Sequence, residues 1–83
     1  MLIWHDDAWE EYLYWYATDK KLFVRLNQLI KDVKRSPFEG LGKPEPLKGN
    51  LSGLWSRRTD QEHRLVYRVI DGDIEIAQCK GHY

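Results

Sequence analysis

The dipeptide Asp71-Gly72 constrains the fold of this chain more than any other feature. It separates two segments of alternating apolar and polar residues, 63–70 and 73–80. This pattern predicts two antiparallel strands joined by a two-residue hairpin turn. With the dipeptide at the centre of the turn, Arg68 falls opposite Glu75, a favourable cross-strand charge pair. The turn therefore predicts the register of the whole hairpin.

This register divides the side chains of the hairpin between two faces. The apolar face, which we expect to pack against helices, holds Leu65, Tyr67, Val69, Ile74 and Ile76. The other side, the open face, holds Arg64, Val66, Arg68, Glu75, Ala77 and Cys79. Strict alternation places His82 on the apolar side, away from Arg64. Gly81 tolerates a twist or bulge that would re-aim this histidine.

A short strand and two helices are predicted before the hairpin. Residues 2–4 form the strand, and Asp7 with Glu10 resembles a capping box in which the aspartate is the N-cap of the first helix. Thr18-Asp19 separates the helices and can cap the second one. Apolar residues then recur at helical spacing until Ser36-Pro37 ends the helix.

Residues 36–53 form a loop that contains all three prolines of the chain, and residues 54–58 form the next strand. The predicted order is therefore β-α-α-β-β-β. This order indicates an α+β fold with an antiparallel twisted sheet and both N-terminal helices packed on one face. Residues 1–83 are too few for more than a single domain.

The first helix is rich in aromatic residues. Trp9, Leu13 and Tyr16 share a stripe at helical spacing, which predicts that they belong to the core. Tyr14 and Trp15 lie off this stripe and are candidates for a partner or self-association surface.

The charge balance excludes a polycation. Thirteen basic and thirteen acidic side chains cancel, so an RNA target must be presented by something else or meet basic groups gathered on one face. No apolar run of about 18 residues predicts a membrane span. The single cysteine cannot form an internal disulfide. A soluble, cytoplasmic protein is expected.

Metal and thiol chemistry have weak support. Cys79 and His82 have the spacing of zinc ligands, with His5 and His63 elsewhere, but no second clear pair completes a site. We therefore expect no metal and no cofactor. Cys79 could be a nucleophile, but its place on a sheet face beside Ala77 favours a packed, inert thiol.

Three side chains match the needs of metal-independent RNA cleavage, which are a base, a cation and an acid. Glu45 stands between two prolines that restrict its backbone, and could be the base. Arg64 offers a planar fork for two phosphate oxygens. His82 has a terminal carboxylate one residue away, which favours the protonated imidazole of an acid. Each also has an ordinary explanation: a solvated loop glutamate, a surface ion pair and a frayed terminus.

Further residues could assist this chemistry. Lys48, Lys43 and Lys80 could add positive field for a phosphate. Tyr83 could stack on a base or orient the histidine before it, or simply pack on the sheet. Arg57 and Arg58 alternate across their strand, so only one of them can face a substrate.

The chain resembles the YoeB toxins of the RelE/ParE superfamily along its whole length. The resemblance is carried by the aromatic helix and by the motifs Pro37-Phe38-Glu39-Gly40, Gly42-Lys43-Pro44-Glu45-Pro46-Leu47-Lys48, Asn50-Leu51-Ser52-Gly53, Trp55-Ser56-Arg57-Arg58, Glu62-His63-Arg64-Leu65-Val66-Tyr67 and His82-Tyr83. It implies a microbial-ribonuclease-like fold and a toxin that cleaves messenger RNA in the ribosomal A site. It also implies a YefM-type antitoxin as partner and a toxin homodimer.

The resemblance also implies roles for individual residues. Glu45 would be the general base, Arg64 the phosphate-stabilising cation and His82 the general acid. Tyr83 would support the site, and Lys48 would contact a phosphate. Gly49 and Lys80-Gly81 depart from the familiar pattern, and Gly81 is expected to loosen the tether of the terminal histidine.

Two other classes of function are compatible with the same fold. One is a non-catalytic toxin of the ParE kind that binds a topoisomerase. The other is a plain RNA- or protein-binding module, which would form no covalent product. The joint presence of Glu45, Arg64 and His82 favours the nuclease, because a binder has no need of all three.

Overall fold

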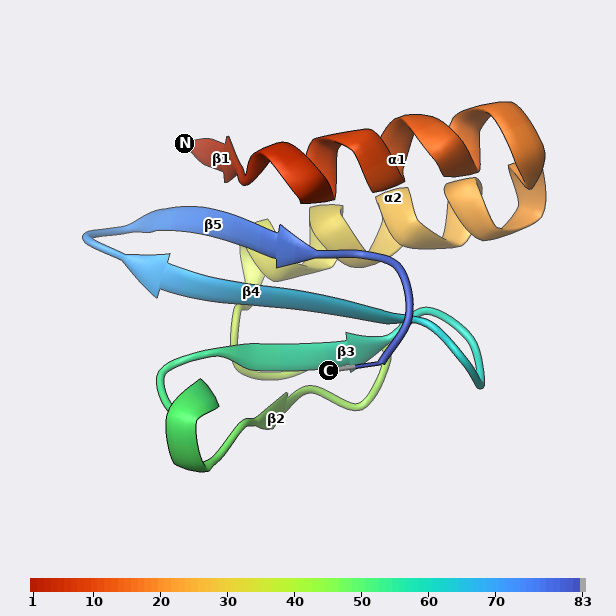
Figure 1. Ribbon diagram of the computed structural model, residues 1–83. Helices are drawn as coiled ribbons and strands as arrows, with labels where there is room; N and C mark the ends of the chain where they lie inside the picture. Colours follow the sequence, from red (N-terminus) through yellow and green to blue (C-terminus); the bar gives the residue numbers. More distant parts are fainter. Residues whose placement is uncertain (83) are drawn as a thin grey trace.

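The structure of the protein is a computed structural model that describes residues 1–82, and it combines two helices with a five-stranded sheet (Figure 1). The elements in chain order are β1 (Leu2–Trp4), α1 (Asp6–Thr18), α2 (Lys20–Arg35), β2 (Glu45–Pro46), the short 3₁₀ turn η1 (Gly49–Leu51), β3 (Trp55–Arg58), β4 (Arg64–Ile70) and β5 (Asp73–Gln78). The strand order across the sheet is β1-β5-β4-β3-β2. The predicted α+β class with a helical hairpin is confirmed.

The sheet is mixed rather than wholly antiparallel. β1 pairs in parallel with β5, so that Leu2 lies opposite Ile74, and the other neighbouring strands are antiparallel. A parallel pair needs a long connection, and the chain between β1 and β5 contains both helices and the other three strands. β2, which the sequence left as loop, adds the fifth strand. The predicted element order β-α-α-β-β-β therefore lacked β2, and the sheet is mixed where an antiparallel sheet was predicted.

The helix boundaries follow their capping residues. Asp19 caps α2, because its side-chain oxygen accepts a hydrogen bond from the Leu22 amide at 3.0 Å, as predicted. The predicted N-cap of α1, Asp7, lies two residues after the observed N-cap, His5. α1 begins at Asp6 after His5, and Asp7 lies inside its first turn, where a negative charge suits the helix dipole.

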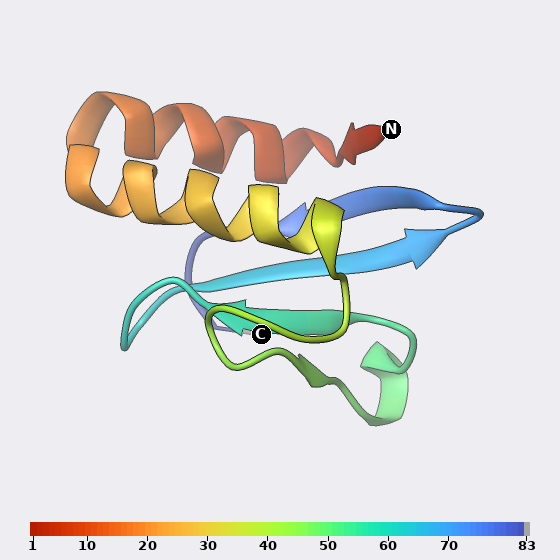
Figure 2. The same cartoon turned by 180° about the vertical axis from the view of Figure 1, so that it is seen from behind.

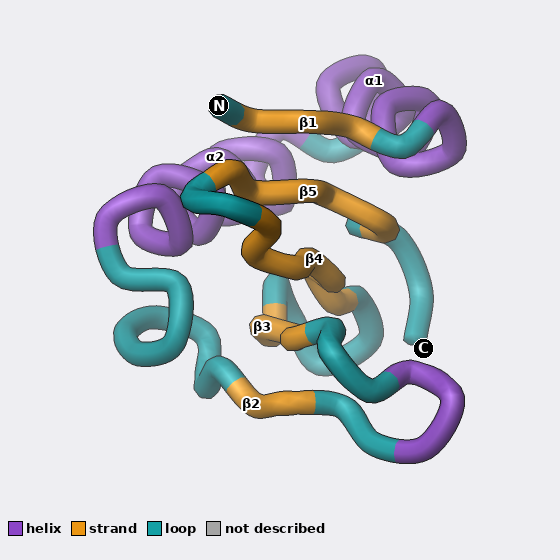
Figure 3. Tube along the Cα trace, turned by 90° about the vertical axis from the view of Figure 1, so that its left-hand side faces the viewer, coloured by secondary structure: helices purple, strands orange, loops and turns teal. Residues whose placement is uncertain are grey.

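The two helices run antiparallel, and α2 covers one face of the sheet (Figure 1). From behind, α2 is the nearer helix and the sheet lies beyond it (Figure 2). Seen along the sheet, α2 and the segment that follows β5 lie on opposite sides (Figure 3). The core between α2 and the sheet includes Leu26, Leu29, Val33, Leu65, Tyr67 and Ile76. The predicted apolar face of the hairpin is thus in the core.

The aromatic residues of α1 do not lie where the sequence placed them. Trp9, Leu13 and Tyr16 are 43%, 41% and 63% exposed, whereas Ala8 and Trp15 are buried. α1 packs against the sheet only near β5, close to one edge of the sheet. The side of the helix that carries Ala8 therefore faces inward. The predicted core stripe is a surface, and the predicted surface tryptophan belongs to the core.

The hairpin has the predicted register as far as Tyr67, which pairs with Ile76. The next pair is Val66 with Gln78, so Ala77 is an extra residue in β5 and forms a β-bulge. Beyond a bulge the alternation of side chains is reversed. Cys79, which strict alternation placed on the open face, is therefore buried in the core.

Candidate functional site

The open face of the sheet brings the predicted base and cation to the same side. Across β2, β3, β4 and β5, Glu45 pairs with Ser56, Ser56 with Val66, and Val66 with Gln78. Directly paired residues point to the same face of a sheet. Glu45 is therefore on the open face. Arg64, two residues before Val66, is on it as well.

Glu45 is part of a hydrogen-bonded strand. β2 pairs with β3, and the Leu47 amide continues the contact by donating to the Leu54 carbonyl at 2.9 Å. Both lysines near this strand, Lys43 and Lys48, are exposed. Glu45 therefore lies on a short strand rather than on a loop, and it is exposed to solvent.

Arg64 is a fixed cation at the start of β4. Only 8% of the residue is exposed. Its Nη1 donates to the backbone carbonyls of Asp60 at 3.0 Å, Gln61 at 3.3 Å and His63 at 3.1 Å. Carbonyl acceptors orient a guanidinium without cancelling its charge. The alternative of an exposed arginine in a surface ion pair is therefore wrong.

A second arginine stands beside Arg64. Arg58 of β3 is its paired residue, so both side chains belong to the open face. The sequence left open which member of Arg57-Arg58 faces this side, and the register assigns it to Arg58. Two like charges directly opposite each other repel, which favours an anion between or above them.

The segment after β5 crosses the open face. The Arg64 amide donates to the Gly81 carbonyl at 3.0 Å, and the side-chain amide of Gln78 donates to the His82 carbonyl at 3.0 Å. His82 is thus on the side of Arg64, not on the apolar side that strict alternation predicted. The bulge that redirects the chain is at Ala77, upstream of the predicted position. Tyr83 lies outside the described residues.

The three predicted phosphate-binding lysines are not brought together. Lys48 precedes η1 beside β2, and Lys43 lines a hollow together with Arg25 and Arg58. The ammonium group of Lys80 lies 5.1 Å from the centre of the Tyr14 ring, on α1. Of the three, Lys80 is turned toward the helix.

Sequence reasoning missed the role of Arg57, which is fully buried. Its guanidinium contacts the Asp32 carboxylate and donates to the carbonyls of Ser36, Glu39 and Leu41, all of which lie at the end of α2 or in the following loop. These contacts fix the loop that leads to β2. A signal was present: Asp32 is an acidic residue within the apolar side of α2, where burial demands a partner.

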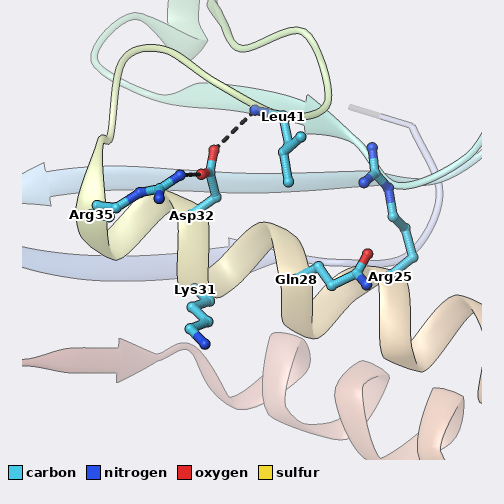
Figure 4. A pocket seen from close by; sticks show the side chains of 6 residues that line it. All are labelled: Arg25, Gln28, Lys31, Asp32, Arg35 and Leu41. Atoms are coloured by element: carbon cyan, nitrogen blue, oxygen red, sulfur yellow. Dashed lines mark hydrogen bonds and ion pairs between the residues drawn. The ribbon is translucent and has the colours of Figure 1, made fainter.

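Asp32 completes this buried hub. It also accepts hydrogen bonds from the Leu41 amide and from Arg35 (Figure 4). The Leu41 amide, followed by the Arg57 guanidinium, lowers the pKa of Asp32 to about 2. The carboxylate is therefore charged at any physiological pH. Gly40 closes over it, since a Cβ at that position would lie 2.1 Å from the Asp32 Oδ2.

Cys79 is not placed for catalysis. Its Sγ lies 3.4 Å from the Ala8 carbonyl oxygen inside the core, and burial raises the pKa of the thiol to about 12. Within residues 1–82, no three His, Cys, Asp or Glu side chains are grouped in a way that could hold a metal ion. In the same part of the chain, neither helix has the length and apolar character required to cross a bilayer.

Known proteins are similar to this chain along almost its whole length. The family model for the YoeB-like toxin of bacterial type II toxin–antitoxin systems matches residues 4–83. The toxin YoeB of Escherichia coli strain K12 is 60% identical over 82 residues, which are 99% of this chain and 98% of that protein.

Two solved structures from Staphylococcus aureus are similar throughout. The toxin in a heterotetrameric YoeB–YefM complex is 48% identical with a TM-score of 0.92, and the alignment covers 100% of this chain and 97% of that one. The YoeB dimer is also 48% identical, with a TM-score of 0.91 and coverage of 99% and 95%. This chain belongs to the family of YoeB-like toxins of bacterial type II toxin–antitoxin systems.

Proposed function

We propose that this protein is a ribosome-dependent endoribonuclease that cleaves translated messenger RNA in the A site and so inhibits translation. The observation that carries the proposal is the convergence of Glu45, Arg64 and the His82 segment on the open face. They provide a carboxylate, a fixed cation and an imidazole. General acid–base catalysis of phosphodiester cleavage needs these three kinds of group and no metal.

The reaction is a transesterification. Glu45 accepts the proton of a ribose 2′-hydroxyl, and the 2′-oxygen attacks the adjacent phosphorus. Arg64 stabilises the negative charge that grows on the phosphate oxygens, with Arg58 beside it. Protonated His82 gives its proton to the leaving 5′-oxygen. The bond between phosphorus and that oxygen breaks, which leaves a 2′,3′-cyclic phosphate upstream and a 5′-hydroxyl downstream.

Auxiliary roles are proposed for four further residues. Lys48, next to β2, is proposed to contact a neighbouring phosphate, and Tyr83 to support His82. Lys43 adds positive field near Arg58. Lys80 would add positive field at the phosphate only after its ammonium group had moved away from the Tyr14 ring. It is therefore the weakest candidate of the three lysines for a phosphate contact.

The charge of the protein supports delivery of the substrate by the ribosome. Equal numbers of basic and acidic side chains give no bulk attraction for nucleic acid. A ribosome that presents the message in its A site removes the need for such attraction. The protein would then work in the cytoplasm, as a single domain of residues 1–83.

The proposed partners are a YefM-type antitoxin and a second copy of the toxin. Both are supported by the related complexes from Staphylococcus aureus. The exposed apolar side chains Trp9, Leu13 and Tyr16 offer a surface that contact with a protein would cover.

The experiment is in vitro translation of a defined message with the wild-type protein and with His82→Ala, followed by mapping of the RNA ends. We expect cleavage within the A-site codon that leaves a 5′-hydroxyl, reduced by roughly 10²–10⁴-fold in the variant, the usual range for loss of an acid or base. His5→Ala removes another exposed histidine, paired with Glu75, and serves as the control.

An intact message with normal translation would refute the nuclease. Inhibition of a topoisomerase by the same preparation would then favour a ParE-like toxin. Loss of cleavage in both histidine variants would indicate a general effect on folding, so circular dichroism accompanies each assay.

A further inference from the structure

We infer that His63, which is outside the proposed set of base, cation and acid, is a positioning residue for His82. Its Nδ1 accepts a hydrogen bond from the Gly81 amide at 2.8 Å and thereby fixes the segment that carries the acid. The inference rests on the proposed function for the role of His82. The hydrogen bond itself can be tested without any activity.

The imidazole of His63 is held in place from several sides. The His63 amide donates to Oδ1 of Asp60 at 2.6 Å, which orients the backbone of the loop before β4. The ring packs edge-to-face against Trp15 of α1, with 4.6 Å between the ring centres. Only 13% of the side chain is exposed. Nδ1 is therefore aimed at Gly81 by packing as well as by the hydrogen bond.

The hydrogen bond defines the chemical state of the ring. An amide N–H can only donate, so Nδ1 must be unprotonated and its proton belongs on Nε2. Nε2 faces the Glu62 carboxylate at 3.8 Å. His63 consequently acts as a neutral acceptor, whereas the proposed role of His82 requires a proton to give. His63 therefore accepts a hydrogen bond, whereas His82 is proposed to donate a proton.

Two consecutive residues hold both backbone groups of Gly81. His63 accepts from its amide, and the Arg64 amide donates to its carbonyl. The side chain of Arg64 carries the proposed phosphate-binding guanidinium. The position of the acid segment is thus set directly against the phosphate-binding cation. The expectation that Gly81 loosens the tether was wrong, because this glycine, with φ of 80°, is bonded at both ends.

The other contacts of the segment do not replace this one. Cys79 is fixed by Glu11, which accepts from its amide, and by the Trp15 indole, which donates to its carbonyl. The Gln78 side chain binds the carbonyls of Lys80 and His82. Among the described residues, only His63 accepts from the Gly81 amide. Loss of Nδ1 would leave that N–H without its partner, one residue from the acid.

The test compares two substitutions that separate packing from hydrogen bonding. His63→Phe keeps a ring against Trp15 but has no acceptor. His63→Asn has no ring but places an amide oxygen near the position of Nδ1. We expect His63→Phe to lower the single-turnover cleavage rate on programmed ribosomes about 10- to 100-fold, with little change in the concentration dependence, as expected when a catalytic group is misplaced. His63→Asn should remain within about threefold of wild type, despite being the less stable variant.

A second readout uses the purified full-length protein alone. Hydrogen exchange of the Gly81 amide, followed by NMR, should be at least about tenfold faster in His63→Phe than in wild type, and close to wild type in His63→Asn. His5→Phe makes the same change at an exposed histidine whose side-chain partner is Glu75. It should alter neither cleavage nor Gly81 exchange.

Each outcome bears on one conclusion. Wild-type cleavage and Gly81 protection in His63→Phe would overturn the inference, and so would equal loss of cleavage in the Phe and Asn variants. If wild type fails to cleave RNA while Gly81 exchange responds as described, the proposed function is refuted and the tether is supported.

Discussion

Two nearly buried arginines on adjacent strands do different work because they lie on opposite faces of the sheet. Arg57 points to α2, where a carboxylate and three backbone carbonyls surround it. Arg64 points to the open face, where, within residues 1–82, all its guanidinium hydrogen bonds come from Nη1 and go to carbonyls. The first charge is neutralised inside the fold. The second is oriented but still able to meet an anion.

The comparison shows that burial alone does not identify a functional arginine. The hydrogen-bond acceptors distinguish the two arginines. A carboxylate neutralises the charge of the guanidinium, whereas backbone carbonyls orient the guanidinium and leave its charge available to a ligand. Substitutions at the two arginines and at their neighbours test this contrast.

Replacement of Arg57 should have the largest effect on folding. Arg57→Met removes the buried ionic partner of Asp32, leaving only the exposed Arg35 to pair with it, and removes the donors of the loop carbonyls. We therefore expect a loss of about 3–5 kcal/mol in the free energy of unfolding. Urea denaturation measures it. Arg58→Met, on the exposed neighbour, should cost less than about 1 kcal/mol. Equal effects of the two changes would contradict the assignment of Arg57 as a structural hub.

Replacement of Arg64 should act on cleavage rather than on folding. Arg64→Lys keeps the charge but loses the planar fork, and we expect A-site cleavage to fall about 10- to 100-fold. The melting temperature should move by only a few degrees. A variant that unfolds as readily as Arg57→Met would show that both arginines are structural.

Acid should weaken the buried hub within a defined pH range. The pKa of Asp32 is lowered from 3.8 to about 2 in the folded state, so its contribution to stability is complete above about pH 4 and is lost as the pH falls toward 2. Glu75, whose pKa is lowered by hydrogen bonds from His5 and Arg68, acts in the same direction. Urea midpoints between pH 2 and 5 should fall steeply for wild type and less steeply for Asp32→Asn. Parallel curves for the two proteins would disprove the role of Asp32.

The smallest effect is expected at Cys79. Burial raises the pKa of this thiol to about 12, so it should resist alkylation at pH 8 in the folded protein and react only after unfolding. Cys79→Ala should cost about 1 kcal/mol and leave cleavage unchanged. Rapid alkylation of the native protein would mean that the segment after β5 opens readily, which would also weaken the tether at Gly81.

Much of the fold could be predicted because the relevant signals are local. The Asp71-Gly72 turn fixes its register through the geometry of two residues. The Asp19 cap and the proline after Ser36 delimit α2 in the same way. The open-face position of Arg64 follows from the turn, since strand alternation carries the register from pair to pair.

The alternation of side chains between the two faces of the sheet gave wrong predictions after the irregularity in β5. The bulge at Ala77 reverses the faces of the residues after it, so the sequence placed Cys79 and His82 on the wrong sides. Nothing in an alanine marks a bulge. Its surroundings are set by residues distant in the chain, since Trp15 and Glu11 of α1 both hydrogen-bond to Cys79, two residues after Ala77.

Features with strong local chemistry could be read from the sequence: the hairpin, α2, and a glutamate, an arginine and a histidine suited to phosphodiester cleavage. Three features depend on how the chain packs: which residues of α1 are buried, which arginine is neutralised, and the hydrogen bond from Gly81 to His63. The physical reason is distance along the chain. Caps and turns depend on neighbours a few residues away, whereas His63 with Gly81 and Arg57 with Asp32 meet only after the sheet and helices have packed.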